Sequence, residues 1–164
     1  MSLLDEDKKM YINRKIMPKY QVYYRKSAQC RFLPLKLFYL VLFDRHRKRC
    51  LCDFPRGVKI GGGLFINHPY CITIHPDAVL GEKVCLHKGV TIGQSNRGKY
   101  KGVPTIGNNV CICVNATIVG KIKIGNDVII GPNAYVSRDV PDHSVVTGNP
   151  CTIRHLDNAT EGYV

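Results

Sequence analysis

The sequence predicts an all-β protein, a parallel β-helix of about four coils that follows a short α-helical N-terminal segment. Three observations predict this fold. Aliphatic residues recur every six positions from Ile60 to Val136, the residue four positions later is Ala, Val, Leu or Ile in ten of twelve cases, and Gly directly follows six of the recurrent residues. Neither an amphipathic helix nor an alternating strand gives so long a six-residue cycle. A hexapeptide β-helix does.

The six-residue cycle has twelve members and two irregular intervals. The intervals are eight residues between Ile66 and Ile74 and fourteen between Ile92 and Ile106. We expect each recurrent side chain to point inward and to stack on its copies in an aliphatic column. Glycine is expected where the chain bends, because it accepts dihedrals closed to other residues. The recurrent residues are Ile60, Ile66, Ile74, Leu80, Leu86, Ile92, Ile106, Ile112, Ile118, Ile124, Ile130 and Val136.

Both irregular intervals predict departures from the coil. The stretch Gln94–Val103 is polar, rich in Gly and Lys, and lacks a column residue. It predicts a loop extruded from the coil at 94–104, and loops held by a rigid scaffold often carry binding groups. The shorter irregularity places His68 at a break in the wall of the coil.

Residues 1–50 are predicted to form a helical segment before the coil domain at 51–154 and a C-terminal tail at 155–164. Pro18 and Pro34 are expected to separate two or three short helices. Five apolar residues of this segment need a partner, and capping the open end of the coil is the favoured role. Another subunit remains an alternative, and contact with a membrane surface is left open but not expected. These residues are Leu37, Tyr39, Leu40, Leu42 and Phe43.

The composition fits one domain, since the chain has 164 residues of which 45% are hydrophobic. The net charge of +12 is uneven: residues 1–50 hold 13 Lys and Arg against 4 Asp and Glu, and the rest holds 11 against 8. A nucleic-acid partner is not expected, because the basic segment lacks a recognised motif or a pattern of stacking aromatics. No signal peptide is evident. The longest apolar run, Phe32–Phe43, has 12 residues against the roughly 20 that span a bilayer, so a cytoplasmic location is expected.

The eight cysteines are expected to be reduced, because no secretory signal precedes them. Cys111 and Cys113 fall inside the repeat, where a free cysteine packs as a small hydrophobic residue. Two CxC pairs, Cys50/Cys52 and Cys111/Cys113, are a weak indication of zinc, which favours CxxC pairs. No metal is therefore expected.

His68 and Asp53 are the candidate catalytic pair. Transfer of an acyl group to a hydroxyl needs a base beside the acceptor and a group that orients the base. The two residues are 15 apart, and with 18 residues a coil they lie nearly above one another. A carboxylate that holds one ring nitrogen would leave the other free as a base. The remaining histidines are expected to face outward or to lie at the surface.

From Asp53 to Arg154 the chain resembles the serine acetyltransferase branch of the hexapeptide transferases, and especially its short members from bacterial surface-polysaccharide genes. The motifs that carry the resemblance are CDFPRGVKIGGGLFINHPYCITIHPDAVLGEKV, KGVTIG, PTIGNNVCICVNATIVGKIKIGNDVIIGPNAYVSRDVP and SVVTGNP. The resemblance implies a left-handed coil, a homotrimer, and acetyl-CoA bound in the groove between neighbouring coils. It matches His68 to the catalytic base and Asp53 to its partner, with direct attack on the thioester and no acyl-enzyme.

The same resemblance suggests further binding residues. Val114, Gly131 and Pro132 match positions along which the pantetheine chain runs, and Arg154 is a candidate partner for a CoA phosphate. Two acceptor-binding positions depart from the serine-specific pattern: Asn67 replaces an Asp before the base, and Val103 replaces a second His at the end of the loop. Loss of these charged groups favours a sugar hydroxyl over serine.

The sequence therefore leaves four functions to compare. An O-acetyltransferase acting on a sugar or glycan precursor comes first, and a serine O-acetyltransferase of cysteine biosynthesis comes second. A γ-type carbonic anhydrase on the same fold would need three converging histidines. The spacings between His68, His75 and His87, 7 and 12 residues, do not suit it. A non-catalytic scaffold is the last alternative, and the Asp53/His68 pair argues against it.

Overall fold

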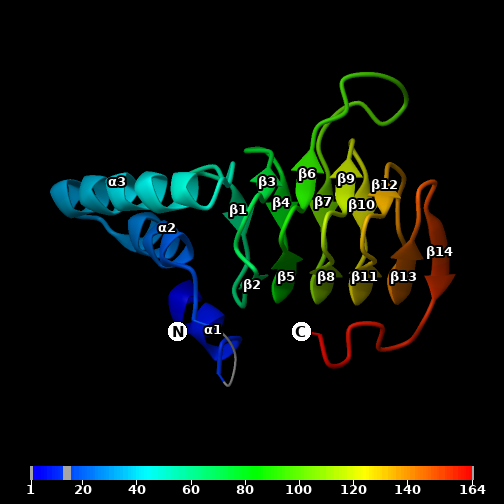
Figure 1. Ribbon diagram of the computed structural model, residues 1–164, viewed down its shortest axis with the longest axis horizontal. Coiled ribbons are helices and arrows are strands. Elements are labelled where there is room, and N and C mark those ends of the chain that lie inside the picture. Colours follow the sequence, from blue (N-terminus) through cyan, green and yellow to red (C-terminus); the bar gives the residue numbers. More distant parts are fainter. Residues whose placement is uncertain (1, 13–15, 164) are drawn as a thin grey trace.

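The computed structural model describes residues 2–12 and 16–163, so residues 1, 13–15 and 164 of the predicted end segments lie outside it. Within these residues the chain forms three helices and then a parallel β-helix (Figure 1). The helices are α1 (Leu3–Lys9), α2 (Lys19–Gln29) and α3 (Leu33–Arg49). Pro18 is the N-cap of α2, whereas Pro34 lies in the first turn of α3, where its missing N–H has no intrahelical partner to lose.

Short strands wind around the coil and stack into three sheets. One sheet has the order β1-β4-β7-β10, the second β3-β6-β9-β12, and the third β2-β5-β8-β11-β13-β14. The strands are β1 (Lys59–Ile60), β2 (Phe65–Asn67), β3 (Thr73–Ile74), β4 (Val79–Leu80), β5 (Val84–His87), β6 (Thr91–Gly93), β7 (Thr105–Ile106), β8 (Val110–Ile112), β9 (Thr117–Val119), β10 (Lys123–Ile124), β11 (Val128–Ile130), β12 (Tyr135–Val136), β13 (Ser144–Thr147) and β14 (Thr152–His155).

The register of the parallel sheets follows the aliphatic column. Ile60 pairs with Leu80, Leu80 with Ile106, and Ile106 with Ile124. The step between partners is 20, then 26, then 18 residues, so the extra residues leave the coil without shifting its register. Figure 1 shows the largest excursion between β6 and β7, where Ser95 and Gly102 pair at the base of a projecting loop. The predicted parallel β-helix is confirmed.

The corner positions beside the column are filled as expected, with one exception. The sequence pattern assigned Tyr70 to the corner after Ile66, but the Tyr70 side chain is 55% exposed and Ile72 is fully buried in its place. The reason is the longer interval: the corner residue lies two positions before the next column residue, and the inserted residues push Tyr70 outward. The tight bend is closed by a hydrogen bond from Tyr70 N to His68 O at 2.8 Å.

The glycines after the column residues are required for a reason different from the expected one. Gly61, Gly81, Gly107 and Gly125 stack at one corner, and none of them has a positive φ. A Cβ on Gly81 would lie 2.6 Å from Gly107 O, and one on Gly107 would lie 2.5 Å from Gly125 O. The close approach of successive coils, rather than an unusual dihedral, therefore excludes side chains at this corner.

The helical segment closes the open end of the coil. Tyr20, Tyr24 and Phe43 are buried against Phe54, and they join the same core as the aliphatic column. Side chains of the segment also bond the backbone of the first coil: the Tyr24 hydroxyl donates to Val58 O at 2.5 Å. The first coil has no preceding coil to pair with, so these side chains satisfy backbone groups that would otherwise be unpaired.

A buried ion pair lies at the centre of this cap. The Arg25 and Asp7 side chains are 2% and 0% exposed, with Arg25 Nε 2.7 Å from Asp7 Oδ2. Arg25 also donates to Ile60 O at 2.8 Å and to Gly61 O, while Asp7 Oδ1 accepts the Leu64 N–H at 2.9 Å. The full set of bonds compensates the cost of burying both charges.

Helix α3 only partly meets the coil. Phe43 is fully buried, but Leu37 is 53% exposed, and the apolar surface extends over Phe38 and Val41, which are 55% and 64% exposed. Capping therefore accounts for one part of the predicted apolar surface and leaves the outer part uncovered. Over the described ranges, none of the helices combines the length and apolarity needed to cross a bilayer.

Candidate active site

His68 lies on an irregular bend between β2 and β3. It is exposed, and its backbone is left-handed with φ of +55°. The other left-handed residues of the coil mostly occupy two regular corners. One corner holds Lys83, Asn109, Asp127 and His143, each directly before a strand, and the other holds Cys71, Gly89, Asn115 and Asn133. His68 belongs to neither corner, so its conformation arises from the inserted residues. Non-glycine residues in this region cluster at functional sites.

Asp53 lies on the coil end that the helices cap. It forms an isolated bridge with Thr73, and its side chain is 76% exposed. Its neighbour Cys52 has Sγ 3.7 Å from Pro69 O, so the backbone before Asp53 runs beside the bend that carries His68. Arg47 Nη1 lies 3.6 Å from Asp53 Oδ1, and Arg47 also donates to Asp44 at 2.9 Å. Arg47, which the sequence did not single out, thus adds positive charge beside this carboxylate.

Several of the predicted binding residues share one long edge of the coil. Asn67 pairs with His87 in the next coil, and Asn115 N, just after Val114, bonds Lys88 O at 3.0 Å. In the coil after that, Asn133 N bonds Val114 O at 3.0 Å, which brings Gly131 and Pro132 to the same edge. The edge therefore runs from His68 past Val114 to Pro132.

Val103 and Arg154 lie elsewhere. Val103 is half-buried between the extruded loop and β7, at the corner between the second and first sheets, whereas His68 lies at the corner between the third and second. Within one chain these two corners are different edges of the coil. Arg154 is on β14, where it pairs with Val145 and is exposed.

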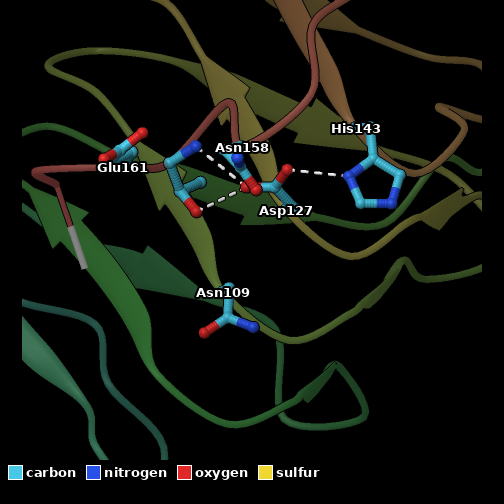
Figure 2. Close-up of a pocket in the computed structure, with 6 residues that line it drawn as sticks. Asn109, Asp127, His143, Asn158 and Glu161 are labelled. Atoms are coloured by element: carbon cyan, nitrogen blue, oxygen red, sulfur yellow. Dashed lines mark hydrogen bonds and ion pairs between the residues drawn. The ribbon is translucent and has the colours of Figure 1, made fainter.

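A pocket of about 540 Å³ lies where the C-terminal tail folds back onto the coil (Figure 2). Asp127 is its central group. Its carboxylate accepts bonds from the backbone N–H groups of Ala159 and Thr160, both at 2.9 Å, from the Thr160 hydroxyl at 2.7 Å, and from His143 Nδ1 at 2.8 Å. These four contacts fix the tail against the corner before β11.

The electrostatics of this pocket match a structural role. Burial raises the pKa of Asp127, but hydrogen bonds from Thr160, His143 and Ala159 outweigh it and lower the pKa to about 2. The hydrogen bond to Asp127 raises the pKa of His143 above its usual value. A carboxylate that is engaged by four donors has no free acceptor capacity for a reacting group. We therefore assign Asp127 and His143 to holding the tail.

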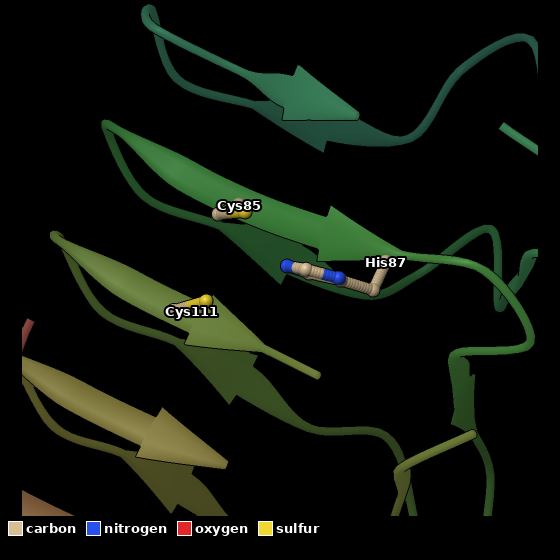
Figure 3. Close-up of side chains that lie close together, drawn as sticks. All are labelled: Cys85, His87 and Cys111. Atoms are coloured by element: carbon tan, nitrogen blue, oxygen red, sulfur yellow. The ribbon is translucent and has the colours of Figure 1, made fainter. Parts of the chain in front are cut away.

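The structure also gathers a group of side chains that sequence reasoning missed. The ligand atoms of Cys85, His87 and Cys111 all lie within 4.8 Å of one another (Figure 3). The sequence analysis treated Cys111 as a packing residue and His87 as an outward-facing histidine. The signal that could have found them is the 26-residue offset between Cys85 and Cys111, which equals one coil plus the eight residues of the extruded loop.

Comparisons with known proteins agree with this architecture. Residues 104–138 match the model of the family described as bacterial transferase hexapeptide (six repeats). A serine acetyltransferase of Staphylococcus aureus is 39% identical over 106 residues, which cover 65% of this chain and 50% of the relative. The chain thus spans about half the length of the curated relatives that it matches.

Solved structures show the same fold. A serine acetyltransferase of Brucella abortus in complex with coenzyme A matches 94% of this chain and 67% of its own, with a TM-score of 0.78 and 23% identity. A serine acetyltransferase of Neisseria gonorrhoeae in complex with serine matches 93% of this chain and 67% of its own, with a TM-score of 0.71 and 26% identity. The predicted left-handed β-helix with a short helical N-terminal segment is confirmed.

Proposed function

Because the coil of this chain is a hexapeptide-repeat domain related to serine acetyltransferases, we propose that the protein transfers an acetyl group from acetyl-CoA to a hydroxyl of a small acceptor. The observation that carries the proposal is His68, which is exposed in a left-handed conformation at the irregular bend of the coil. The edge that begins at this bend offers the positions at which the co-substrate would lie.

His68 acts as the general base in this proposal. Its ring removes the proton of the acceptor hydroxyl while the hydroxyl oxygen attacks the thioester carbonyl. The tetrahedral intermediate collapses with cleavage of the carbon–sulfur bond, and the proton held by His68 passes to the departing thiolate. Asp53 orients the ring from the capped end of the coil, and Arg47 supports Asp53 through its contact at 3.6 Å. Backbone N–H groups at the bend would stabilise the oxyanion.

The co-substrate fits the edge between Val114 and Pro132. Val114 is half-buried and Pro132 is exposed, so both offer apolar surface along which a pantetheine chain could lie. Gly131 is buried, and a Cβ there would lie 3.0 Å from Val146 O, so its lack of a side chain already serves the packing of the coil. Arg154 is exposed on β14 and free to meet a phosphate group.

The proposed site is shared between subunits of a homotrimer. Within one chain Val103 and its loop lie on a different edge from His68. The loop projects away from its own coil (Figure 1), so Val103 can approach a His68 only if that histidine belongs to a neighbouring copy. A trimer of coils packed edge to edge would bring the two together around each groove.

The names of the relatives favour L-serine as the acceptor, since both the curated relatives and the solved structures are serine acetyltransferases. The sequence analysis placed a sugar hydroxyl first, and the comparisons support its alternative better. A sugar or glycan precursor stays the second candidate for a specific reason: Asn67 and Val103 supply no charge with which to bind an amino acid.

The proposal is tested by thiol release from acetyl-CoA with the full-length protein, offered L-serine and a panel of nucleotide and free sugars in parallel. We expect turnover with a hydroxyl acceptor, and we expect His68→Ala to reduce it by about 10²–10⁴-fold. His75→Ala, which removes an outward histidine at another corner, is the matched control and should keep full activity. Thiol release that is equal in the parent and in His68→Ala would remove His68 from the mechanism. Absence of turnover with every acceptor would favour a non-catalytic scaffold.

A further inference from the structure

We propose that Cys85, His87, Cys111 and Cys113 form a zinc site that joins two successive coils. This inference goes beyond acetyl transfer and does not depend on it. The four residues come from the outward faces of β5 and β8, which are adjacent strands of the third sheet. In the chain these strands flank β6, the extruded loop and β7, so a bound ion would clip together the two coils that the loop interrupts.

The register of the strands creates a square of ligands. Cys85 pairs directly with Cys111, and Leu86 pairs with Ile112, so His87 and Cys113 occupy the next outward position on each strand. Inward residues such as Leu86 belong to the aliphatic core, whereas Cys85, Cys111 and Cys113 form a separate cluster on the other face. Paired strands are about 4.8 Å apart and alternate residues about 6.6 Å apart, which brings four side chains over one point.

The distances suit a tetrahedral ion after small side-chain rotations. The Sγ atoms of Cys85 and Cys111 and a ring nitrogen of His87 lie within 4.8 Å of one another (Figure 3). Zinc bonds of about 2.3 Å to sulfur and 2.0–2.1 Å to nitrogen require separations between ligands of about 3.5–3.8 Å. The three atoms must therefore approach by about 1 Å, which χ rotations can supply without movement of the strands.

Cys113 is positioned to be the fourth ligand. A hydrogen bond with Cys111 and burial raise the pKa of the Cys113 thiol, while the nearby His87 lowers it. These interactions place the Cys113 sulfur against both of the other groups. Three thiolates and one imidazole make a closed Cys₃His set, which is typical of structural zinc sites.

The alternative explanation is that small thiols simply fill an outward apolar stripe. Phe65, Cys85, Cys111, Ile129 and Val145 do form such a stripe, and free cysteine packs well as a small hydrophobic residue. This explanation accounts for the cysteines but not for His87, whose half-buried imidazole points into the same group. Among the residues that the structure describes, the Cys85/His87/Cys111 group is the one set of three or more metal-ligating side chains brought this close.

Zinc binding to the full-length, fully reduced protein tests the site. The chelator-treated protein is titrated with Zn²⁺ against a chromophoric chelator, and with Co²⁺ to observe the thiolate charge-transfer band and the intense visible bands of a tetrahedral ion. We expect one ion per chain and a Co²⁺ spectrum of thiolate type. At a hundredfold excess over its Kd, zinc should raise the melting temperature by about 5–10 °C, because it binds only the folded coil.

The variants separate this site from other cysteines. Cys85→Ser and Cys111→Ser should each weaken binding by about a hundredfold or more, and His87→Gln should weaken it and change the Co²⁺ spectrum. Cys30→Ser and Cys71→Ser are matched controls that should bind like the parent; Cys71 lies beside Cys50 rather than in the cluster. Thermal unfolding of each metal-free variant verifies that it folds.

Stoichiometric binding that survives Cys85→Ser and Cys111→Ser would overturn the proposal, as would a parent protein that binds no zinc in competition with the chelator. A cobalt spectrum without thiolate bands would also overturn it. All of these measurements read the metal itself, so their outcome is independent of whether the protein transfers acetyl groups.

Discussion

Individual side chains at the corners of the coil perform three different tasks. His68 is exposed at the one bend that departs from the repeat, Gly81 leaves room for the next coil, and Asp127 fixes the C-terminal tail. Left-handed backbone alone does not distinguish these tasks, since both His68 and Asp127 have a φ near +55°. Exposure and hydrogen bonding do, because Asp127 is saturated with donors and His68 lies open to solvent.

At the residue scale, Asp53→Asn tests whether the carboxylate orients the base. The amide keeps the shape of the side chain but loses the charge that would favour a protonated His68 during transfer. We expect kcat/KM to fall by about 10–100-fold, less than for His68→Ala because the base itself remains. The measurement is acetyl transfer as a function of pH, with the acidic limb displaced in the variant.

The control for this prediction is Asp77→Asn, which removes a carboxylate that contacts His75 instead. It should leave the pH profile unchanged. An Asp53→Asn variant with the rate and pH profile of the parent would show that the carboxylate has no part in orienting the ring.

A second prediction at this scale concerns pH and the tail. The folded-state pKa of Asp127 is about 2, below its usual 3.8, so its contribution is present above about pH 4 and lost as pH falls towards 2. The pKa of His143 is raised above 6.5, so its contribution is complete below that pH and lost as pH rises through the folded-state value. Amide protection at Ala159 and Thr160 should therefore be greatest between about pH 4 and 6.5.

Asp127→Asn checks this assignment by hydrogen exchange. The neutral amide accepts weaker bonds, so the tail should lose protection while the column strands keep theirs. Asp157→Asn, at an exposed position beside His155, is the matched control. If the tail of Asp127→Asn exchanges as slowly as in the parent, the carboxylate is not what holds it.

At the scale of elements, the helices act as a polar cap rather than as an apolar lid alone. The cap supplies donors and acceptors from α1 and α2 to the backbone of the first coil, with Arg25 reaching Ile60 O and Asp7 reaching Leu64 N. The basic character of residues 1–50 therefore has two parts. Arg25 is buried in an ion pair, whereas residues such as Lys48 and Arg49 are exposed at the end of α3.

Arg25→Met is the prediction at this scale. It leaves the Asp7 carboxylate buried without its cation, which costs about 3–5 kcal/mol in the free energy of unfolding. The double variant Asp7→Leu/Arg25→Met removes both charges and should recover part of the loss. Urea denaturation of the full chain measures both, with the exposed Arg31→Met as the control. Equal stability of Arg25→Met and the parent would show that the pair does not support the cap.

At the scale of the whole molecule, the aliphatic column makes the coils a single cooperative unit. Ile118 is fully buried, and in the second sheet it pairs with Ile92 on one side and with Val136 on the other. Each coil contacts mainly its neighbours, so a defect in one coil weakens two interfaces. The extruded loop is tolerated because it leaves at a corner and returns without changing the register of the column.

Ile118→Ala should therefore lower the free energy of unfolding by about 2–5 kcal/mol, through lost burial and the cavity that it leaves. Val79→Ala, in the outward position of β4 where the side chain is 38% exposed, should cost much less. Denaturant midpoints of the two variants give the comparison. A similar loss in both would mean that the column is not the main source of stability.

The sequence by itself determined the coil, its column and the place of the extruded loop. A six-residue period is a local property of the chain, and it fixes the register because a slip would move every column residue out of the core. The same period located the two irregular intervals, and the shorter one identified His68 before any contact was known.

Only the tertiary structure decided which distant side chains meet. It showed that the Gly81 corner excludes a Cβ, that Asp7 and Arg25 pair beneath the first coil, and that Cys85, His87 and Cys111 converge. It also placed Val103 on a different edge from His68. A repeat gives the height of a residue along the coil, but contact depends on the corner that it occupies, the direction of its side chain and the helices that cover it, and these are set by packing between segments far apart in the chain.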